Sequence, residues 1–538
     1  MRPISRADFL KGLGGLAVLG LGFQFLRVQP AQFRVSMVGP SRQVGHRLRD
    51  LMKDGAAALS SFVDCGSKTV VIVGGGMAGL SAGWWLKKNG IEDFLILELE
   101  PQVGGNSSFG ENAVSKFPWG AHYVPLANSE SKYVRQLFLE LGIIEADHDK
   151  EKPRYNELYL CHDPQERLFK DGSFQEGLVP KRGLKPSEEA EMKRFFDTVH
   201  ELRDVKGSDG KPAFAIPLDH SSEDPRFRDL DKISFARWLK ENNFVSRPLN
   251  WYVNYCCRDD YGATAENVSA WAGLHYFAGR RGHAANAETN SVVTWPEGNG
   301  FLVSRLKELL ADKIVTNAPV LRLTEDKEGG SFCYFTRDGA VSRYKTRFTI
   351  FCAPRFLAPY LVENYKLEKK PTYAPWLVAN ITLKKAPGGR GVGLAWDNVS
   401  YYGDSLGYVV ANHQNITTRR SSVVVTYYLP LSQLPPDAAR RKLLNSPEKA
   451  WSAAIVDDLE AMHPGITEDI ISIDLWPWGH GMISPGVDYI WQERRKLPLN
   501  QGQVHFAHSD MSGISNFEEA QYQGVQAAER VLAQLEKS

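Results

Sequence analysis

Three glycines at the spacing of a dinucleotide site follow a short apolar run. Residues 69–73 (TVVIV) are β-branched and predict a buried parallel strand, and a helix is predicted over 80–88. In such a turn the first glycine permits the tight bend, the second lets the backbone approach a pyrophosphate, and the third lets helix and sheet pack closely. The helix start also offers free N–H groups and a positive dipole end to the phosphates. The predicted contacts are Gly74, Gly76, Met77, Ala78 and Gly79.

An acidic residue ends the next predicted strand. Phe94–Leu97 is again apolar, and Glu98 follows it about 20 residues after the glycines, where a carboxylate accepts hydrogen bonds from ribose hydroxyls. Strand, glycines, helix, strand and acid therefore occur in the order of a Rossmann-type unit.

The residues after Glu98 resemble the flavin-containing amine oxidase superfamily, in which the second strand ends E-x-x-x-x-V-G-G-R. Here Val103, Gly104, Gly105 and Asn106 occupy the last four places, so Asn106 replaces the usual arginine. The resemblance implies FAD as the cofactor, with the glycine doublet and Asn106 on its pyrophosphate.

Four later segments continue this resemblance. Residues 116–123 (KFPWGAHY) resemble the segment beside the isoalloxazine ring, which implies contacts from Gly120, Ala121 and His122. Residues 317–320 resemble the returning strand that touches the adenine, through Val320, and residues 350–354 resemble the strand that closes the flavin domain. Residues 504–513, followed by a helix predicted from Gln523, resemble the closing motif. Either Ser509 or Asp510 is the acid that holds the ribityl chain there, and Asp510 is preferred.

These scattered segments predict a discontinuous domain. The expected fold class is α/β, with a Rossmann-type FAD-binding domain and an interleaved α+β substrate domain. The predicted parts are an N-terminal signal-like or anchor segment and linker at 1–66, an FAD-binding domain at 67–130, 291–356 and 500–538, and a substrate domain at 131–290 and 357–499.

The substrate domain contains the catalytic candidates and several aromatic stretches. Residues 251–262 hold tyrosines, a tryptophan and Arg258 next to two acids, and they are interpreted either as core or as the wall of a pocket in which Arg258 pairs with Asp259 or Asp260. Strands are predicted over 376–383 and 423–429, one helix over 435–463, and an aromatic loop facing the ring over 476–486. His480 in that loop and His122 are the catalytic candidates, although a buried structural histidine is an equally good interpretation of His480.

The N-terminus carries an imperfect export signal. Residues 5–11 (SRADFLK) resemble the twin-arginine consensus S-R-R-x-F-L-K, with Ala7 in the place of the second arginine. The uncharged stretch 12–26 is short for a membrane span. The sequence predicts a periplasmic or membrane-tethered protein, and a cytoplasmic location is the alternative.

Composition narrows the class of partner. The 538 residues include 64 Lys and Arg against 63 Asp and Glu, a net charge of +1, which argues against nucleic-acid binding. The six cysteines show no metal-binding spacing, so no metal is predicted. The aromatic share of 11% suits a pocket for a small molecule.

The resemblance implies an FAD-dependent oxidoreductase that transfers hydride from a small-molecule substrate, an amine by preference, to flavin N5. O2 or a quinone would accept the electrons, because one dinucleotide site is visible. The alternatives are a desaturase or protoporphyrinogen-oxidase-like dehydrogenation of a C–C or C–N bond, and a redox-neutral or structural flavoprotein.

Overall fold

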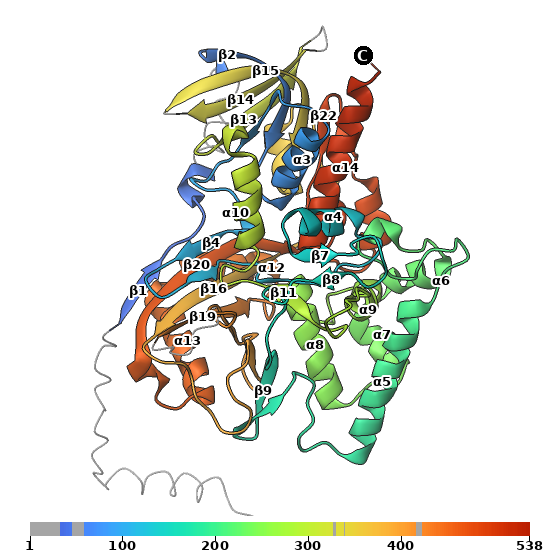
Figure 1. The fold of residues 1–538 in the computed structure, drawn as a ribbon, viewed down its shortest axis with the longest axis vertical. Coiled ribbons are helices and arrows are strands. Elements are labelled where there is room, and N and C mark those ends of the chain that lie inside the picture. Colours follow the sequence, from blue (N-terminus) through green and yellow to red (C-terminus); the bar gives the residue numbers. More distant parts are fainter. Residues whose placement is uncertain (1–32, 46–58, 327–329, 338, 416–421, 538) are drawn as a thin grey trace, which may run out of the picture.

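The computed structural model describes residues 33–45, 59–326, 330–337, 339–415 and 422–537. Its elements form two large sheets with helices on and between them (Figure 1). The predicted export signal and most of the predicted anchor segment lie outside the described residues. No described helix is long and apolar enough to cross a bilayer.

The first sheet is mainly parallel and has the order β12-β3-β2-β15-β14-β13, with β22 paired to β15 and β21 to β22. The C-terminal end of β2, Val70–Val73, is buried in the interior of this sheet. The strands are β2 Val63–Val73, β3 Phe94–Leu97, β12 Ile314–Val315, β13 Val320–Glu325, β14 Ser331–Arg337, β15 Ala340–Phe351, β21 Asn500–Gln501 and β22 Val504–Phe506.

Helices α3 and α14 pack together against this first sheet (Figure 1). Gly79 allows α3 to approach the turn that follows β2, because a Cβ at this position would lie 1.9 Å from the carbonyl oxygen of Gly74. The helices here are α3 Met77–Lys88, α4 Lys132–Glu140, α10 Gly300–Leu309, α11 Ala358–Leu361 and α14 Phe517–Leu535.

The second sheet has the order β1-β20-β16-β19-β18-β17-β9-β10. Its central strand β16 is buried along its whole length, and β20 and β19 flank it in antiparallel register. The strands are β1 Arg34–Met37, β9 Glu166–Lys170, β10 Ser173–Glu176, β16 Tyr373–Leu383, β17 Asp397–Ser400, β18 Tyr408–Val410, β19 Val423–Pro430 and β20 Ile470–Ile483.

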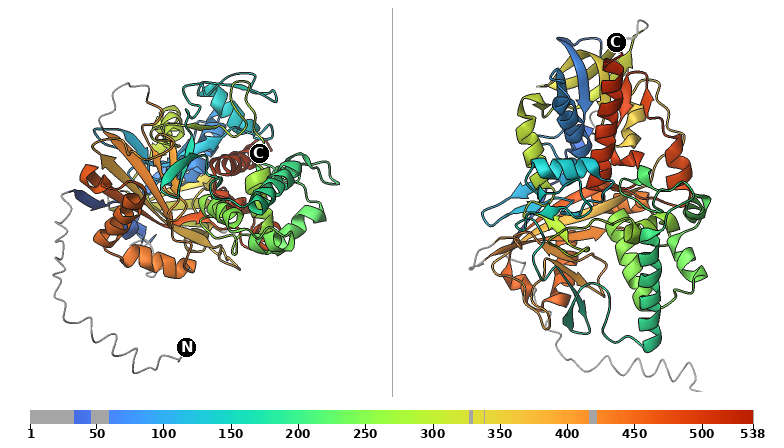
Figure 2. Two further views of the ribbon diagram at one scale, coloured as in Figure 1. Left: turned by 90° about the horizontal axis from the view of Figure 1, so that it is seen from below. Right: turned by 45° about the vertical axis from the view of Figure 1, so that its right-hand side comes forward.

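Helices lie beside the second sheet in two groups (Figure 2). One group is α12 Pro436–Asn445 and α13 Glu448–Met462, and the other is α5 Pro186–Asp204, α6 Pro225–Arg228, α7 Phe235–Glu241, α8 Arg247–Tyr261 and α9 Ala270–Ala278. Short two-stranded sheets complete the fold: β4 Phe109–Glu111 with β5 Lys116–Pro118, β6 Tyr123–Pro125 with β11 Val292–Thr294, and β7 Ile144–Ala146 with β8 Arg154–Tyr155.

The predicted α/β class and the Rossmann-type unit are confirmed. The domain boundaries stay a prediction, and the structure adds that residues 34–37, within the predicted linker, form a strand of the second sheet by parallel pairing with β20.

Three predicted elements were wrong in detail. The helix predicted over 435–463 is two helices, because Ser446 precedes Pro447 and adopts an extended backbone that a helix cannot contain. The predicted aromatic loop 476–486 lies largely in strand β20, where its aromatic residues pair with β16. The last helix begins at Phe517, six residues before Gln523, because the side chain of Asn516 caps it by accepting from the Glu519 N–H.

The packing of α14 on α3 predicts whether an alanine at position 524 raises or lowers the free energy of unfolding. Alanine normally favours a helix over glycine by about 1 kcal/mol. At position 524 its Cβ would lie 2.2 Å from the Ala78 carbonyl oxygen, so Gly524→Ala should instead lower the free energy of unfolding by about 1–3 kcal/mol. Denaturant unfolding measures it, with Gly393→Ala as the control because no atom lies within 4 Å of its added Cβ. A stabilised Gly524→Ala protein would contradict the close helix contact.

Candidate functional site

The glycine turn between β2 and α3 is shaped to expose backbone. Gly74 has φ +99°, which favours glycine, and Gly76 caps α3 with open space on its Cβ side, where the nearest atom is Gly105 Cα at 4.0 Å. Met77 and Ala78 form the first turn of α3, which contains no acidic residue. The first N–H groups of the helix therefore point to a site suited to an anion.

Glu98 ties this turn to the end of β3. Its side chain is 9% exposed, and its carboxylate accepts from the Gly75 N–H at 2.6 Å and the Glu100 N–H at 2.8 Å. Burial raises the pKa of Glu98, while the two amides favour the charged form. Each carboxylate oxygen keeps a lone pair for a ribose hydroxyl.

The glycine doublet lies directly against the glycine turn. The Gly104 N–H donates to the Gly75 carbonyl at 2.9 Å, and Gly104 and Gly105 have φ of +131° and +55°. The adjoining Ser108 is buried, and its hydroxyl finds no partner in the described structure. Two facing backbone segments and an unpaired hydroxyl fit a dinucleotide pyrophosphate.

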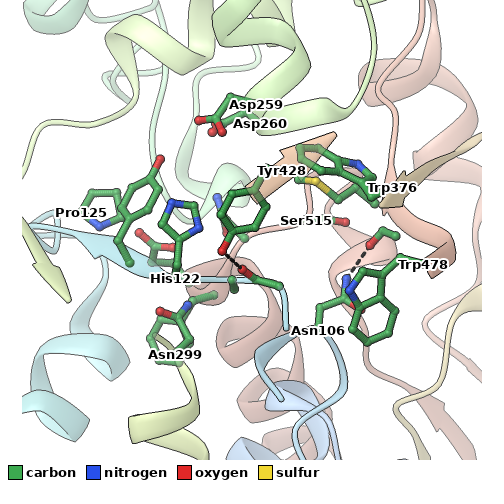
Figure 3. A pocket seen from close by; sticks show the side chains of 18 of the residues that line it. Asn106, His122, Pro125, Asp259, Asp260, Asn299, Trp376, Tyr428, Trp478 and Ser515 are labelled. Carbon is green, nitrogen blue, oxygen red and sulfur yellow. Dashed lines mark hydrogen bonds between the residues drawn. The ribbon is translucent and has the colours of Figure 1, made fainter. Parts of the chain in front are cut away.

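A cavity of about 160 Å³ lies between the glycine-rich segments and the second sheet (Figure 3). Its wall joins predicted cofactor contacts to residues of β16, β19 and β20, of α8 and of the segment that starts α14. The residues that line it include Asn106, Gly120, Ala121, His122, Asp259, Asp260, Arg280, Asn299, Trp376, Tyr428, Trp478 and Glu518.

The second sheet holds the segment 119–122 in place at this cavity. The Tyr428 hydroxyl donates to the Gly120 carbonyl at 2.8 Å, and Trp478 Nε1 donates to the Trp119 carbonyl at 2.7 Å. The His122 ring stacks on Tyr428 with centroids 4.7 Å apart. Asn106 is also held in place. Its side-chain amide donates to the Gly481 carbonyl, and its backbone carbonyl accepts from the Ala121 N–H.

Burial lowers the pKa of His122 to about 4, because the imidazolium loses its hydration. The ring is therefore neutral near pH 7, so one of its nitrogens can donate a hydrogen bond and the other can accept one.

Like the glycine turn, Glu98 and the glycine doublet, the predicted contacts Val320 and Asp510 lie outside the cavity wall. Val320 begins β13, and Ala318, two residues earlier, donates its N–H to the Glu98 carbonyl at 2.8 Å, so this segment runs beside the end of β3. Asp510 is fully buried and accepts from the Arg355 N–H at 2.8 Å and the Tyr373 hydroxyl at 2.5 Å. The role of Asp510 or Ser509 on a ribityl chain stays a prediction.

His508 also contacts Asp510, at 3.1 Å. Although burial opposes ionisation, the nearby charge of His508 holds the pKa of Asp510 below its ordinary value. Arg355 and Tyr373 both donate to Oδ2, and Oδ1 has no hydrogen-bond partner among the described residues.

The structure does not bring His480 into the cavity with His122. Its ring stacks on Phe356 at 4.2 Å and meets the edge of Tyr373 at 5.7 Å. Burial, with the nearby charge of Arg440, lowers its pKa to about 4. These contacts match those of a structural histidine.

Asp259 and Asp260 line the cavity, as one of the two interpretations of residues 251–262 predicted. That interpretation also pairs Arg258 with Asp259 or Asp260, but Arg258 donates to Ser432 and to the Asp404 carbonyl. Neighbours one or two positions apart on a helix point in different directions. Asp260 instead pairs with Arg280 at 2.6 Å, and no local signal identified that distant partner.

Comparisons with known proteins agree with this geometry. Residues 72–141 match the family model "NAD(P)-binding Rossmann-like domain". The "Probable flavin-containing monoamine oxidase A" of Dictyostelium discoideum is 21% identical over 464 residues, which cover 83% of this chain and 92% of that protein. The "L-amino acid dehydrogenase" of Synechocystis sp. is 25% identical over 309 residues, 56% of this chain and 58% of that protein.

Solved structures share the fold at low identity. A putrescine oxidase double mutant superposes with a TM-score of 0.64 at 16% identity, covering 88% of this chain and all of that one. A fatty acid isomerase from P. acnes gives a TM-score of 0.59 at 16% identity, covering 86% and 98%. The resemblance to the flavin-containing amine oxidase superfamily is confirmed.

Loss of the Glu98 carboxylate should weaken flavin retention. In Glu98→Ala the Gly75 and Glu100 N–H groups lose a buried acceptor, a cost of about 1–3 kcal/mol, and the ribose loses its partner. The ratio of flavin to protein absorbance after gel filtration measures the effect, with exposed Glu92→Ala as the control. An unchanged flavin content and affinity in Glu98→Ala would remove this assignment.

The buried neutral His122 should make the protein sensitive to acid. Its pKa of about 4 lies below the ordinary 6.5, so between these values the unfolded chain binds the extra proton and stability falls as pH falls. His122→Gln should lose less unfolding free energy than the wild type between pH 7 and pH 5, by at most about 1.4 kcal/mol per pH unit. Exposed His200→Gln should keep the wild-type slope, and an unchanged slope in His122→Gln would show that folding does not lower the pKa of His122.

Proposed function

We propose that this chain, whose fold is that of the flavin-containing amine oxidase superfamily, is an FAD-dependent oxidoreductase that oxidises a small amine. The observation that carries the proposal is the cavity where Gly120, Ala121 and His122 meet the aromatic side chains of Trp376, Tyr428 and Trp478. FAD supplies the hydride acceptor, its N5 atom, when it is bound.

The residues that would bind FAD lie in the order of the parts of the dinucleotide. The glycine turn, Glu98 and the doublet Gly104–Gly105 would hold the nucleotide and pyrophosphate, and the segment 119–122 would border the ring. FAD rather than a shorter flavin is favoured because the ADP-binding elements are all present.

The cavity wall then acts on the amine. Aromatic and aliphatic side chains exclude water, which lowers the pKa of a bound ammonium and favours the neutral amine that can release hydride. Neutral His122 can accept a hydrogen bond from the amine N–H and orient its α-carbon. Electrons would pass to O2 or a quinone, because one dinucleotide site lies within the described chain.

A second candidate is dehydrogenation without an amine, or a redox-neutral reaction. The fold alone supports it, because a fatty acid isomerase shares the fold and fold does not determine chemistry. The acidic groups at the cavity favour the amine, since a carboxylate attracts an ammonium and repels a carboxylate substrate.

For location, we propose export or membrane tethering, based on the signal-like residues 5–11. Fractionation of cells expressing the full chain or Arg6→Lys tests whether that segment is used as a signal.

Anaerobic titration with primary amines tests the activity. Absorbance near 450 nm should bleach as the amine reduces the flavin. His122→Gln should slow reduction by about tenfold through loss of one positioning hydrogen bond, whereas His480→Gln, outside the cavity, should reduce at nearly the wild-type rate. No bleaching with any amine would overturn the amine proposal, and slow reduction only in His480→Gln would exchange the roles of the two histidines.

A further inference from the structure

A segment that precedes the Rossmann-type unit connects the two sheets. Strand β1 lies beside β20, with Arg34–Met37 in parallel register against Ser472–Leu475 (Figure 1). Four residues after the end of β1, Ser41 contacts Glu100, which lies just beyond β3 in the first sheet. Residues 33–41 are called the strap below.

The first part of the strap is fixed to the second sheet independently of Ser41. Phe33, Val35 and Met37 pack against the apolar core between this sheet and α13. Gly39 then turns the chain with φ +135°, and a Cβ at this position would lie 3.0 Å from Pro477 Cδ. A change at Ser41 therefore leaves the attachment to the second sheet in place.

Ser41 binds both oxygens of one carboxylate. Its N–H donates to Glu100 Oε1 at 2.8 Å, and its hydroxyl donates to Glu100 Oε2 at 2.7 Å. Hydrogen bonds to an ionised acceptor are stronger than those between neutral groups, and a pair of them fixes the orientation of the carboxylate. Glu100 is half-buried, and among the described residues Ser41 supplies both of its side-chain donors. The strap therefore holds the side chain of Glu100.

The backbone of Glu100 in turn holds Glu98. The Glu100 N–H donates to Glu98 Oε1 at 2.8 Å, and the Glu100 carbonyl accepts from the Asn317 N–H at 3.1 Å. Burial raises the pKa of Glu98, and the charge of Glu100 raises it further. Glu100 thus acts on Glu98 through a hydrogen bond and through its charge, and both depend on where Glu100 lies.

We propose that the strap completes the adenosine end of the cofactor site. Ser41 is a positioning residue: it holds Glu100, and Glu100 orients Glu98 towards the ribose hydroxyls. A segment that the sequence indicated as part of a linker thereby determines how tightly the nucleotide is held. This inference rests on the proposed binding of FAD, to which it adds a residue outside the glycine turn, Glu98 and the glycine doublet.

Ligands that contain different parts of FAD separate this role from a general effect on folding. ADP contains the ribose that Glu98 would bind, whereas FMN lacks it. Calorimetry on apoprotein prepared from the purified full-length chain would measure the affinities for FAD, ADP and FMN. Ser41→Ala should weaken the binding of FAD and of ADP by about five- to tenfold, through loss of one hydrogen bond to a charged group, and should leave that of FMN unchanged. Ser41→Thr keeps the hydroxyl and should restore the wild-type affinities.

A double-mutant cycle tests whether Ser41 acts through Glu100. In a Glu100→Ala background, Ser41→Ala should change the ADP affinity by less than about twofold. Ser129→Ala is the matched control, because exposed Ser129 also donates to a carboxylate, that of Glu130, and its loss should leave the ADP affinity at the wild-type value. An unchanged ADP affinity in Ser41→Ala, an equal weakening of FMN binding, or a full effect of Ser41→Ala without Glu100 would overturn the inference.

These outcomes are distinct from those that test the proposed function. Affinities for FAD and ADP that depend on Ser41, in a protein whose flavin no amine bleaches, would keep the role of the strap and reject amine oxidation. Bleaching by an amine, with an ADP affinity unaffected by Ser41→Ala, would keep the oxidase activity and reject the role of the strap.

Discussion

The contact between the glycine turn and the glycine doublet determines where a cofactor can lie. Gly75 and Gly104 share a backbone hydrogen bond of 2.9 Å, and Gly76 and Gly105 approach with no side chain between them. Any larger residue would fill the gap in which phosphates need bare N–H groups. Because the Glu98 carboxylate accepts from Gly75, the glycine turn before α3 is also joined to the end of β3.

The position of the cavity follows from this unit. The chain leaves the doublet through Asn106 and returns at Gly120, and both ends are bonded to the second sheet by Gly481 and Tyr428. A ligand beside this segment therefore contacts both sheets. The cavity has two kinds of wall: aromatic near His122 and acidic near Asp259.

Local patterns predicted the Rossmann-type unit well. The strand Phe94–Leu97 has the bounds the sequence indicated, and the glycines and Glu98 lie where their spacing placed them, because this unit is built from neighbours along the chain. The substrate side depends on distant pairs. Arg280 meets Asp260, and Glu166 lies beside Asp397, across separations that no periodicity reports. His480 shows the same limit: an aromatic, glycine-containing stretch indicated a loop, whereas most of it pairs with β16 as a strand. The His480 ring stacks on Phe356 and does not line the cavity.

The most direct test is a crystal structure of the protein purified with its native flavin. The pyrophosphate should lie between Gly76 and Gly105, and the isoalloxazine ring should border the segment 119–122 inside the cavity. A flavin ring outside that cavity, or phosphates away from the start of α3, would contradict this arrangement of cofactor and substrate sites.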